Sequence, residues 1–583
     1  MSHPNRNTLW ADTFVDELAE GGVDAVCLAP GSRSTPLTVA FATHDDIEVF
    51  SHLDERSAAF FALGRAKRTG KPTPLVCTSG TAAANFHPAI IEADRARVPM
   101  LVCTADRPPE LRDSGANQTV DQEKLYGDAV RWYADIAEPA AEPRKLRYLR
   151  TTAARALGSA TGTPPGPVHL NFPFRKPLEP TEVSGDVPDD FADEHPLAGT
   201  GREGPFVHVS QGVPEPDSAS LAEISNAVSD AERGLLVVGP ADAPMPTRSA
   251  LSELADETGF PILADPLSGH RFGHDRTVVG GYDSYLISDV TDEWPDPDVV
   301  LRFGASPTSK VLRQYLERTA ARQFLVDSAG GWREATFTAT DLVVADPARF
   351  ARRLADELTG QTKNDDWFAR FERAESCHWK LVEGTNEDFE GGVLSSVAEL
   401  APDPATLFVS NSMPVRDIDR FGKPRSADVT VLGNRGASGI DGITSSALGA
   451  GSATDDPLVL VTGDIAYYHD MNGLLALARC GVDATIVEIN NDGGGIFHTL
   501  PIESFDPPFT GQFRTPHGLD FEATEGLYDL DFDRVETLSE FREQFQTSLD
   551  TAGTQVIEVI TDAEASHRIR ESLQNTLIRE LSD

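Results

Sequence analysis

Short apolar runs alternate with longer amphipathic stretches along the N-terminal third of the chain. Residues 74–80, 99–106 and 166–173 are apolar runs bounded by Gly, Pro or other small residues, which is typical of buried strands. The stretch 81–97 between the first two runs is predicted to form a helix, and 21–37 repeats the pattern of a strand followed by a loop. A strand, a helix and a second strand in this order predict a βαβ unit, whose crossover makes the strands parallel.

The same pattern returns twice further along the chain. The second block holds five such segments: 233–244, 259–266, 297–312, 322–330 and 341–347. The third block holds five more: 405–419, 429–442, 457–481, 484–497 and 554–562. A connector rich in Pro, Gly and acidic residues follows the first block, from Lys176 to about Pro205. The pattern predicts an α/β fold of three successive doubly wound parallel-sheet domains, over residues 1–180, 206–360 and 385–583.

Composition indicates a soluble, multidomain chain. Its 583 residues are 40% hydrophobic, and no apolar run approaches the roughly 18 residues that a membrane helix needs. The N-terminus lacks a basic segment followed by an apolar core, so no export signal is visible and a cytoplasmic location is expected. The five cysteines are scattered and never spaced as C-x-x-C, which favours buried free thiols over disulfides or a zinc site.

The negative charge of the chain argues against anionic partners and indicates an environment of high salt. The formal net charge is -42, which opposes binding to nucleic acid or to an anionic membrane surface. Basic residues are mostly Arg, and Lys is scarce. A surface rich in hydrated carboxylates suits a cytosol of high salt, where screening relieves self-repulsion. We therefore expect a halophilic source.

Polar side chains follow two predicted strands of the third block. Asp464 comes directly after the apolar run 457–462, and Asn491 follows the next strand 27 residues later, just ahead of Gly493. A carboxylate, an amide oxygen and a backbone carbonyl suit Mg²⁺, which prefers octahedral oxygen ligands. A helix expected to begin around Met471 and glycines that admit a close ligand favour an anion beside the metal. The alternative is that Asp464 caps a helix and the glycines form a turn.

A second candidate lies in the first block, where Glu55 and Arg56 stand directly ahead of the apolar run 58–63. The position is a predicted helix start. Taken alone, Glu55 and Arg56 are ordinary residues of a first turn, where the helix dipole favours an acid.

Taken together, the two candidates resemble the thiamine diphosphate (ThDP) enzymes. The dipeptide Gly463-Asp464 followed by the pair at 490–491 resembles the signature with which these enzymes bind the diphosphate, and no P-loop motif occurs. Ile465 departs from the pattern, because many ThDP enzymes have a second glycine there. The resemblance implies ThDP as cofactor, with Mg²⁺ or Mn²⁺ bound by Asp464, Asn491 and Gly493.

The resemblance also implies a catalytic role for Glu55. In ThDP enzymes one buried carboxyl group hydrogen-bonds the pyrimidine N1′ of the cofactor and so promotes loss of the proton from the thiazolium C2. Glu55 occupies the matching place in the first block. In this superfamily the glutamate reaches a cofactor held by another subunit, so the resemblance implies a homodimer at minimum, with a homotetramer as the larger alternative.

Longer stretches narrow the resemblance to one family within the ThDP enzymes. The distinctive stretches are 29–37 (APGSRSTPL), 51–67, 77–93, 104–122, 410–419, 433–442 (GNRGASGIDG) and 463–472 (GDIAYYHDMN). Across nearly the whole chain they resemble the 2-succinyl-5-enolpyruvyl-6-hydroxy-3-cyclohexene-1-carboxylate (SEPHCHC) synthases of menaquinone biosynthesis. The resemblance implies decarboxylation of 2-oxoglutarate and 1,4-addition of the resulting succinyl carbanion to isochorismate.

Four arginines support this interpretation on chemical grounds. Both substrates carry two carboxylates, and a bidentate guanidinium suits carboxylates. Arg33, Arg107, Arg416 and Arg435 are each predicted in loops directly after apolar strands. The alternative for each is a solvated surface arginine with acidic neighbours.

The family's site residues carry over onto matching positions of this sequence. Those implied to contact isochorismate are Ser32, Arg33, Arg107, Asn117, Gln118 and Lys310. Those implied to hold the succinyl carboxylate are Ser412, Arg416 and Arg435. Those implied to bind the cofactor are Glu55, Gly80, Ile440, Gly463, Asp464, Ile465, Asn491, Gly493 and Ile496, with Phe497 and Leu500 lining the substrate side of the thiazolium. Core packing is the alternative for the apolar ones. Val311 departs from relatives that have a second basic residue after Lys310.

Other functions remain as alternatives. A ThDP-dependent 2-oxoacid decarboxylase or carboligase of acetolactate synthase type would act on pyruvate and need fewer arginines. A catalytically inactive ThDP-binding or regulatory subunit would not need Glu55, Asp464 and Asn491 together. A flavoprotein or dehydrogenase is disfavoured, because the G-x-G-x-x-G at 199–204 follows no predicted strand.

Overall fold

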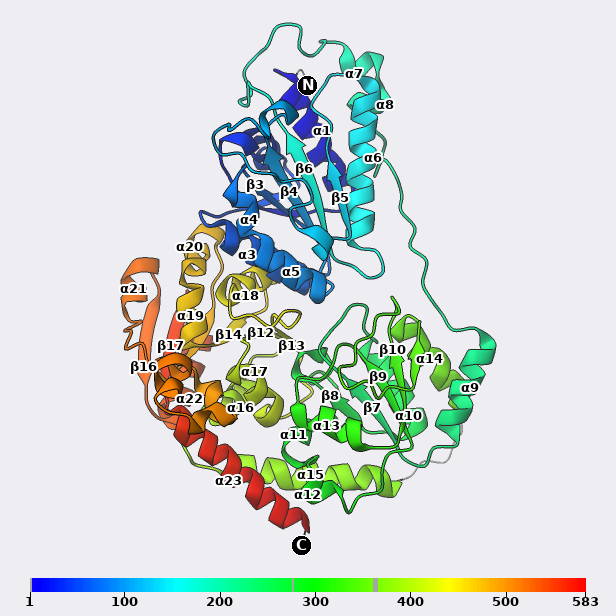
Figure 1. Cartoon of the computed structure of the whole chain (residues 1–583), viewed down its shortest axis with the longest axis vertical. Coiled ribbons are helices and arrows are strands. Elements are labelled where there is room, and N and C mark those ends of the chain that lie inside the picture. The colour runs from blue at the N-terminus through cyan, green and yellow to red at the C-terminus, as the bar shows by residue number, and fades with distance from the viewer. Residues whose placement is uncertain (1–2, 275–276, 360–364, 583) are drawn as a thin grey trace. The chain divides into compact units, whose positions relative to one another are not determined.

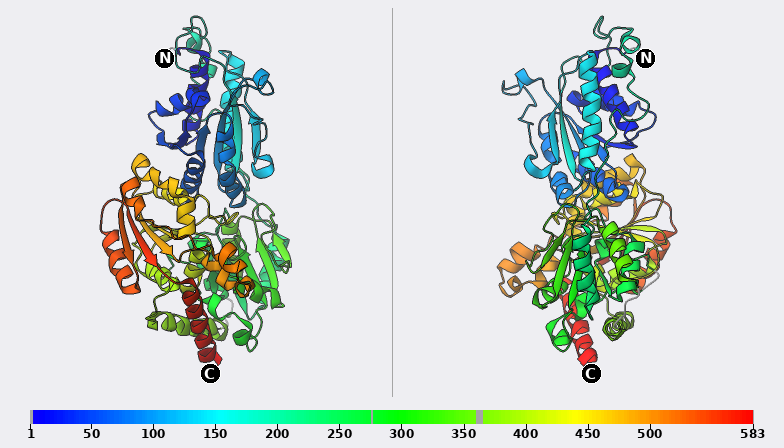
Figure 2. Two further views of the ribbon diagram at one scale, coloured as in Figure 1. Left: turned by 60° about the vertical axis from the view of Figure 1, so that its left-hand side comes forward. Right: turned by 90° about the vertical axis from the view of Figure 1, so that its right-hand side faces the viewer.

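Three parallel β-sheets form the framework of the chain (Figures 1 and 2). The computed structural model describes residues 3–274, 277–359 and 365–582. The predicted domain ends at residues 1, 360 and 583 lie outside this range. The three sheets appear in chain order, so the predicted α/β fold of three parallel-sheet domains is confirmed.

The first sheet is built from strands that are largely covered on both faces. Its order is β2-β1-β3-β4-β6-β5, with every pairing parallel. The strands are β1 (Ala25–Ala29), β2 (Glu48–Ser51), β3 (Thr73–Cys77), β4 (Met100–Asp106), β5 (Trp132–Asp135) and β6 (Pro167–Pro173). The four inner strands are buried along their whole length, which is why they are continuous apolar runs in the sequence.

The second and third sheets are also parallel. The second has the order β11-β10-β9-β7-β8, with β7 (Gly234–Val238), β8 (Ile262–Ala264), β9 (Val299–Phe303), β10 (Arg322–Val326) and β11 (Asp341–Val343). The third has the order β13-β12-β14-β15-β17-β16, with β12 (Ala405–Val409), β13 (Val429–Leu432), β14 (Leu458–Gly463), β15 (Thr485–Asn490), β16 (Asp531–Val535) and β17 (Gln555–Ile560).

The first and third sheets have the same topology. If the strands of each are numbered in chain order, both read 2-1-3-4-6-5. The order reverses between β1 and β3 in one sheet and between β12 and β14 in the other. Open parallel sheets bind ligands beyond the carboxyl ends of the strands at such a switch point. The two places where a ligand is expected are therefore the loops after β1, β3 and β4 and the loops after β12, β14 and β15.

Contacts between residues divide the chain into two compact units. The first unit comprises residues 3–212, 436–455 and 470–482. Its helices are α1 (Arg6–Glu20), α2 (Thr35–Ala42), α3 (Glu55–Thr69), α4 (Thr81–Asn85), α5 (His87–Arg95), α6 (Pro143–Ala160), α7 (Phe191–Glu194), α8 (Pro196–Gly199), α18 (Ile443–Gly451) and α20 (Ala476–Cys480). α1 packs with α2 and α6, whereas α3 packs with α5. Because the inner strands are buried throughout, these two groups cover opposite faces of the first sheet.

The second unit holds the other two sheets, over the described parts of residues 213–435, 456–469 and 483–582. Its helices are α9 (Ser218–Ser229), α10 (Arg248–Thr258), α11 (Tyr282–Tyr285), α12 (Ser288–Thr291), α13 (Lys310–Arg318), α14 (Pro347–Leu358), α15 (Asp365–Gly384), α16 (Glu390–Leu400), α17 (Met413–Phe421), α19 (Asp464–His469), α21 (Ala523–Tyr528), α22 (Leu538–Leu549) and α23 (Ala563–Ser582). None of the helices in the described ranges of either unit combines the length and apolar character that crossing a bilayer requires.

In the first unit, α3 and α18 cross at glycines. A Cβ added to Gly64 of α3 would lie 1.8 Å from the carbonyl oxygen of Ser446, and one added to Gly449 of α18 would lie 2.0 Å from that of Phe61. Any side chain larger than hydrogen would force the two helices apart. The crossing therefore fixes α3, which begins with Glu55, against the segment that follows Ile440.

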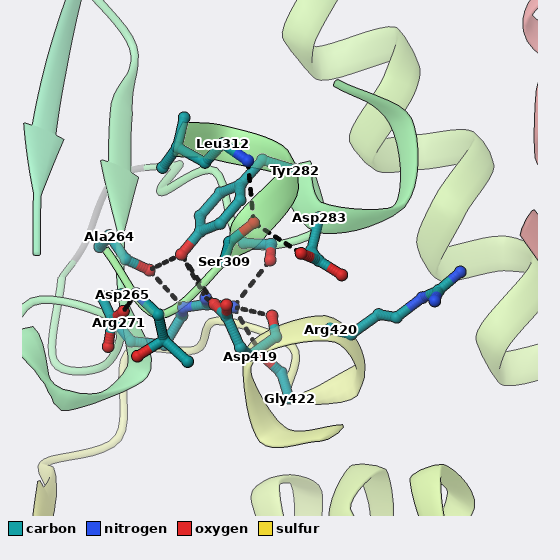
Figure 3. Close-up of polar contacts among 12 residues, drawn as sticks. Ala264, Asp265, Arg271, Tyr282, Asp283, Ser309, Leu312, Asp419, Arg420 and Gly422 are labelled. Carbon is teal, nitrogen blue, oxygen red and sulfur yellow. Dashed lines mark hydrogen bonds and ion pairs between the residues drawn. The ribbon is translucent and has the colours of Figure 1, made fainter. Parts of the chain in front are cut away.

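In the second unit, a buried polar cluster joins the second sheet to α17 (Figure 3). Nη2 of Arg271 donates to Oδ1 of Asp419 at 2.7 Å, and the Tyr282 hydroxyl donates to the same oxygen at 2.7 Å. Nε of Arg271 donates to the Ala264 carbonyl at the end of β8. Burial raises the pKa of Asp419 well above its ordinary range, and Arg271 opposes this effect. The cluster fixes the helix that carries Arg416.

Several local predictions need correction. The predicted helix over 81–97 is two helices, α4 and α5, because Pro88 lacks the N–H that a continuous helix would direct to the Ala84 carbonyl. The helix expected from about Met471 begins instead at Asp464, and Met471–Leu475 is a short 3₁₀ helix. The connector contains two short helices, α7 and α8. The prediction of buried free thiols is confirmed for Cys27, Cys77 and Cys103, whereas Cys377 and Cys480 are free but only half-buried.

Candidate functional site

Asp464 lies at the carboxyl end of β14, in the middle of the third sheet. Its side chain is 3% exposed and accepts hydrogen bonds from the backbone N–H of Ile465 at 2.6 Å and of Gly493 at 2.9 Å. Burial raises the pKa of Asp464, and the two N–H donors offset part of that rise. The Gly493 contact joins the loops after β14 and β15, so the two predicted strand ends do meet. Gly463 is the last residue of β14.

Gly493 occupies a position that only glycine can fill. Its φ is +143°, and an added Cβ would lie 2.0 Å from the carbonyl oxygen of Arg514. A side chain here would displace the loop that holds Asp464. The close approach to the Arg514 carbonyl accounts for the glycine by packing, which the alternative of a turn also predicts.

Asn491 presents an unpaired oxygen two residues before Gly493, whose N–H binds Asp464. Its amide nitrogen donates to Oε1 of Glu390 at 2.8 Å, whereas its Oδ1 is buried and has no hydrogen-bond partner among the described residues. A buried oxygen without a donor is costly unless a ligand completes it. The donor set of Asp464, Asn491 and a carbonyl near Gly493 fits a hard divalent cation, which takes oxygen ligands.

His517 is a neighbour of this site that the sequence does not reveal. Its Nε2 lies 3.2 Å from Oδ2 of Asp464, and its backbone N–H donates to Oδ1 of Asp492 at 2.9 Å. His517 stands in no motif, and it comes 53 residues after Asp464. Only the fold brings the two together.

The predicted succinyl-binding group is assembled at the ends of β12 and β13. Nη1 of Arg416 donates to the Ser412 carbonyl, and Nη1 of Arg435 donates to Oδ1 of Asn411. Arg416 lies in the first turn of α17 rather than in a loop, which corrects the prediction. Ser412 has a φ of 72°, a strained value for a residue with a side chain.

The two arginines create a local excess of positive charge. Solvent reaches the Arg416 side chain, although protein atoms crowd around the guanidinium. Desolvation lowers the pKa of Arg416, and the neighbouring charges of Arg435 and Arg313 lower it further, while Asp283 acts in the opposite direction. Two like charges held together are stabilised by an anion, so this cluster suits a carboxylate. Arg313 was not predicted from the sequence. It is on α13, whose first residue is the exposed Lys310.

The predicted apolar lining of the third block is partly accessible. Ile496 and Phe497 are half-buried in a 3₁₀ helix over Gly495–Thr499, and Leu500 is 45% exposed. The ring of Phe497 packs edge-on against Phe513 at 5.4 Å. These side chains are therefore only partly covered by the protein.

The loops after β1 and β4 form a second basic group, in the first unit. Arg33 is 7% exposed, and its Nη1 donates to the Phe174 carbonyl at 2.6 Å. Burial lowers the pKa of Arg33, and the charge of Arg107 lowers it further. Nε of Arg107 donates to the Asn117 carbonyl at 2.7 Å. Arg33 and Arg107, predicted from segments far apart in the chain, are therefore near neighbours.

Gly80 and Gln118 lie beside this group. Gly80 has a φ of +93°, and an added Cβ would lie 3.1 Å from Cγ of Gln118. The Gly80 N–H donates to Oε1 of Gln122, a buried residue that the sequence did not single out. Ser32, Asn117 and Gln118 are exposed to solvent. The first sheet thus brings together all five residues predicted to contact isochorismate in the first block.

Glu55 is the first residue of α3, as predicted. Asp54 caps the helix, and its Oδ1 accepts from the N–H of Arg56 at 2.8 Å. In this single chain Glu55 is half-buried, whereas a buried carboxyl group was expected. Its Oε2 accepts from the Asn85 amide at a long 3.4 Å. Nη2 of Arg56 lies 3.8 Å from the fully buried Asp470. The Asp54 cap therefore holds the helix start in place, while the Glu55 carboxylate is held only weakly.

Ile440 belongs to the same unit as Glu55. The segment before it is fixed by the buried Glu92, whose carboxylate accepts from the N–H of Gly436 at 2.8 Å and of Ala437 at 2.6 Å. Ile440 is half-buried. Glu92 was not predicted as a site residue, because it reads as one more acid on an amphipathic helix.

Three domain families match successive parts of the chain. Residues 10–125 match the thiamine pyrophosphate enzyme N-terminal TPP binding domain, and residues 425–559 match the corresponding C-terminal TPP binding domain. Residues 210–409 match the family described as the middle domain of thiamine pyrophosphate.

Full-length relatives carry a more specific name. A SEPHCHC synthase of Haloarcula marismortui is 66% identical over 593 residues, covering 100% of both chains. One of Halobacterium salinarum is 62% identical, with 98% of each chain covered, and one of Roseiflexus sp. is 49% identical, again with 98% of each covered. Among solved structures, a thiamine diphosphate-dependent 4-hydroxybenzoylformate decarboxylase of Rhodococcus jostii is similar, with a TM-score of 0.71 and 18% identity over 95% of this chain and 99% of that one. This last likeness supports the fold alone.

Proposed function

Because this chain belongs to the SEPHCHC synthase family of thiamine diphosphate enzymes, we propose that it decarboxylates 2-oxoglutarate and adds the succinyl group to isochorismate in menaquinone biosynthesis. The observation that carries the proposal is the 66% identity to a SEPHCHC synthase over the full length of both chains. Relatives in halophilic archaea agree with a high-salt origin. A cytoplasmic location and the predicted domain boundaries stay predictions.

Glu55 is the proposed catalytic residue. When bound, ThDP supplies an electron sink for the pair of electrons left by loss of CO₂ from a 2-oxo acid. The Glu55 carboxyl group would hydrogen-bond the pyrimidine N1′ and hold the proton there that the chemistry requires. Its weak contact with Asn85 leaves it available for such a partner. Gly80 and Ile440 would contact the cofactor from the same unit.

Asp464, Asn491 and the Gly493 carbonyl are proposed to hold the divalent cation, Mg²⁺ or Mn²⁺. The cation would anchor the diphosphate by charge. Gly463 and Ile465 flank the ligand, and Ile496 would lie against the cofactor. The unpaired Oδ1 of Asn491 is the strongest support for this assignment, because it has no other partner among the described residues.

Two basic groups are proposed to divide the substrates. Arg33 and Arg107, with Ser32, Asn117 and Gln118, would bind the carboxylates of isochorismate, and Lys310 would add a contact. Arg416, Arg435 and Ser412 would hold the succinyl carboxylate, with Phe497 and Leu500 lining the apolar side. The lowered pKa values of Arg33 and Arg416 support both assignments, because each group gains stability from a bound anion.

A homodimer at minimum is proposed, with each site completed by Glu55 of the partner copy. Mixing two inactive variants, Glu55→Gln and Asp464→Ala, tests this arrangement. Random reassociation gives hybrids with one intact site each, and so about a quarter of wild-type activity, if the subunits pair with twofold symmetry. Recovery of no activity after mixing would point to sites within one chain.

The decisive experiment identifies the product. The protein is incubated with isochorismate, 2-oxoglutarate, ThDP and Mg²⁺ in high salt, and the product is identified by mass spectrometry. SEPHCHC and CO₂ are expected. The competing function is that of an acetolactate-type enzyme, so CO₂ release from pyruvate is measured in parallel. Faster release from pyruvate than from 2-oxoglutarate would overturn the proposal.

A further inference from the structure

The side-chain amide of Asn491 can be oriented in two ways, and Glu390 determines which one occurs. Oε1 of Glu390 lies 2.8 Å from Nδ2 of Asn491. A carboxylate only accepts hydrogen bonds, so it must face the NH₂ end of the amide. The oxygen end then points away from Glu390, and this oxygen is the buried Oδ1 that has no partner in the described part of the chain.

Glu390 is itself held in place by a buried network. Nη2 of Arg570 donates to Oε2 of Glu390 at 2.5 Å, and Arg570 also donates to both carboxylate oxygens of Asp417 at 2.8 and 2.6 Å. Glu390, Arg570 and Asp417 are 1%, 5% and 1% exposed. Burial alone would lower the pKa of Arg570, but Asp417 and Glu390 raise it above its ordinary value. Arg570 therefore stays a pure donor, and it keeps Glu390 an acceptor.

The three members come from different helices, so the fold rather than local sequence builds the network. Glu390 begins α16, Asp417 is on α17, and Arg570 is on α23. The N–H of Glu390 donates to the Ser566 hydroxyl at 3.3 Å, and the Thr561 hydroxyl donates to Oε1 at 3.4 Å. Rotation of the Glu390 carboxylate is therefore restricted from several sides.

We propose that Glu390 is a positioning residue that orients the Asn491 amide so that Oδ1 is presented to the divalent cation. The inference rests on the proposed function, in which Asn491 is a metal ligand. Residues that orient a metal ligand typically change metal affinity by 10- to 100-fold when they are replaced. Glu390 touches neither the cation nor the cofactor, so its effect is exerted through Asn491.

The substitution Glu390→Gln tests the orientation directly. Arg570 can only donate, so the new side chain must give its oxygen to Arg570 and its NH₂ group to Asn491. Asn491 must then turn its oxygen towards position 390 and its NH₂ group towards the cation. We expect the affinity for Mn²⁺, measured in the presence of ThDP by the electron paramagnetic resonance signal of free Mn²⁺, to fall about 10- to 100-fold.

Two further variants separate orientation from charge. Glu390→Asp keeps the negative charge but shortens the side chain, so it no longer reaches Asn491, and Mn²⁺ affinity should fall even though the charge is unchanged. In the double variant Glu390→Gln/Asn491→Asp, one carboxylate oxygen can accept from position 390 while the other faces the cation. The double variant should therefore bind Mn²⁺ more tightly than either single variant.

The chain offers a matched control on the neighbouring asparagine. Glu558 is 0% exposed, accepts from Nδ2 of Asn490 at 2.7 Å and pairs with Arg534, so it repeats the same chemistry at a residue that is no proposed ligand. Glu558→Gln should leave Mn²⁺ affinity unchanged. Thermal unfolding of every variant shows which of them are folded.

The outcomes distinguish this inference from the proposed metal site. If Asn491→Ala abolishes Mn²⁺ binding but neither substitution of Glu390 weakens it, the metal site stands and the role of Glu390 is refuted. The inference also fails if Asn491→Asp alone binds Mn²⁺ as tightly as the double variant, since charge would then suffice. If Asn491→Ala itself binds Mn²⁺ normally, the proposed metal site is wrong. If Glu390→Gln does not fold, Glu390→Asp decides the question.

Discussion

The first and third sheets have the same strand order, yet their loops carry opposite chemistry. Four loops correspond in position: those after β1, β2, β3 and β4 in one sheet and those after β12, β13, β14 and β15 in the other. The first set carries Arg33, Glu55, Gly80 and Arg107, and the second carries Ser412, Arg435, Asp464 and Asn491. At the third position Gly80 of the first sheet corresponds to Asp464 of the third, and at the fourth position Arg107 corresponds to Asn491. One strand order therefore carries loop sets of different charge.

The two loop sets also differ in how firmly hydrogen bonds within the chain hold their side chains. Asp464 has two backbone donors, and Asn491 is fixed by Glu390. Glu55 has one contact at 3.4 Å and stays half-buried. The anchoring half of the proposed site is preorganised by its own unit, whereas the catalytic carboxylate needs a further partner to be held.

The largest expected effect is that of Glu55→Gln. Turnover should fall by about 10²- to 10⁴-fold, the range for loss of an acid–base group, because an amide cannot exchange the proton at N1′. Mg²⁺-dependent binding of ThDP, followed by fluorescence quenching, should survive because the cation ligands are in the other loop set. A variant with near-normal turnover would contradict the role assigned to Glu55.

Asp464→Asn should produce the converse pattern. Removal of a direct cation ligand should weaken Mn²⁺ binding by at least about 100-fold, since changes behind a ligand alone cost about 10- to 100-fold. Asp492→Asn is the matched control, because Asp492 bonds to the N–H groups of His517 and Gly518 instead. Equal losses in both variants would show that general negative charge, not ligation, matters.

Replacing one arginine in each basic group should separate the substrates. Arg33→Met should raise KM for isochorismate, and Arg416→Met should raise KM for 2-oxoglutarate. Each change should be about 10- to 100-fold, as expected for a hydrogen bond to a charged group. Steady-state kinetics with each substrate varied in turn measures the effects. If both variants raise the same KM, the proposed division of the substrates is wrong.

Gly64→Ala should destabilise the first unit without touching either loop set. The added methyl group would lie 1.8 Å from the Ser446 carbonyl oxygen, so α3 and α18 must separate. Overpacking of this kind costs about 1–3 kcal/mol, measured by thermal or denaturant unfolding. Gly212→Ala is the control, because nothing lies within 4 Å of an added Cβ there. Equal stability of the two variants would show that the helices have room to move.

Buried histidines should make both units sensitive to acid. Burial lowers the pKa of His52 in the first unit to about 4 and of His378 in the second to about 3, against 6.5 for an unperturbed histidine. Between about pH 4 and 6.5 the unfolded chain therefore binds more protons, and the free energy of unfolding falls as the pH falls. Each histidine contributes about 1.4 kcal/mol per pH unit. Denaturant titrations of His52→Gln and His378→Gln should each show a shallower slope than wild type, and an unchanged slope would contradict the prediction.

Every interior strand was predicted from the sequence, and so were the edge strands β8, β11 and β13, but the other three edge strands were not. Burial on both faces makes an inner parallel strand one apolar run, and all of these were found. The three strands that were missed, β2, β5 and β16, each lie at or next to solvent at the edge of a sheet. Their partly exposed residues remove the apolar signal. Pairing with the neighbouring strand, which is not encoded locally, decides their conformation.

The residues of the candidate site also divide into those that the sequence predicts and those that it does not. Asp464 and Asn491 were predicted because each stands directly after an apolar strand, where the parallel sheet brings strand ends together. Glu390 was missed, because 101 residues separate it from Asn491 and its own neighbours form an ordinary helix start. His517 and Arg313 were missed for the same reason. Residues that act through another side chain leave no pattern in the sequence.

The Arg271–Asp419 pair has a consequence for how the enzyme responds to dilution. Arg271 and Asp419 are each 1% exposed, so mobile ions do not reach them, whereas the carboxylates on the surface repel one another once external salt is removed. Low ionic strength should therefore loosen peripheral helices before it frees α17. In a protein returned from dilute buffer to high salt, the outer helices would then repack around an α17 that had kept Arg416 in position.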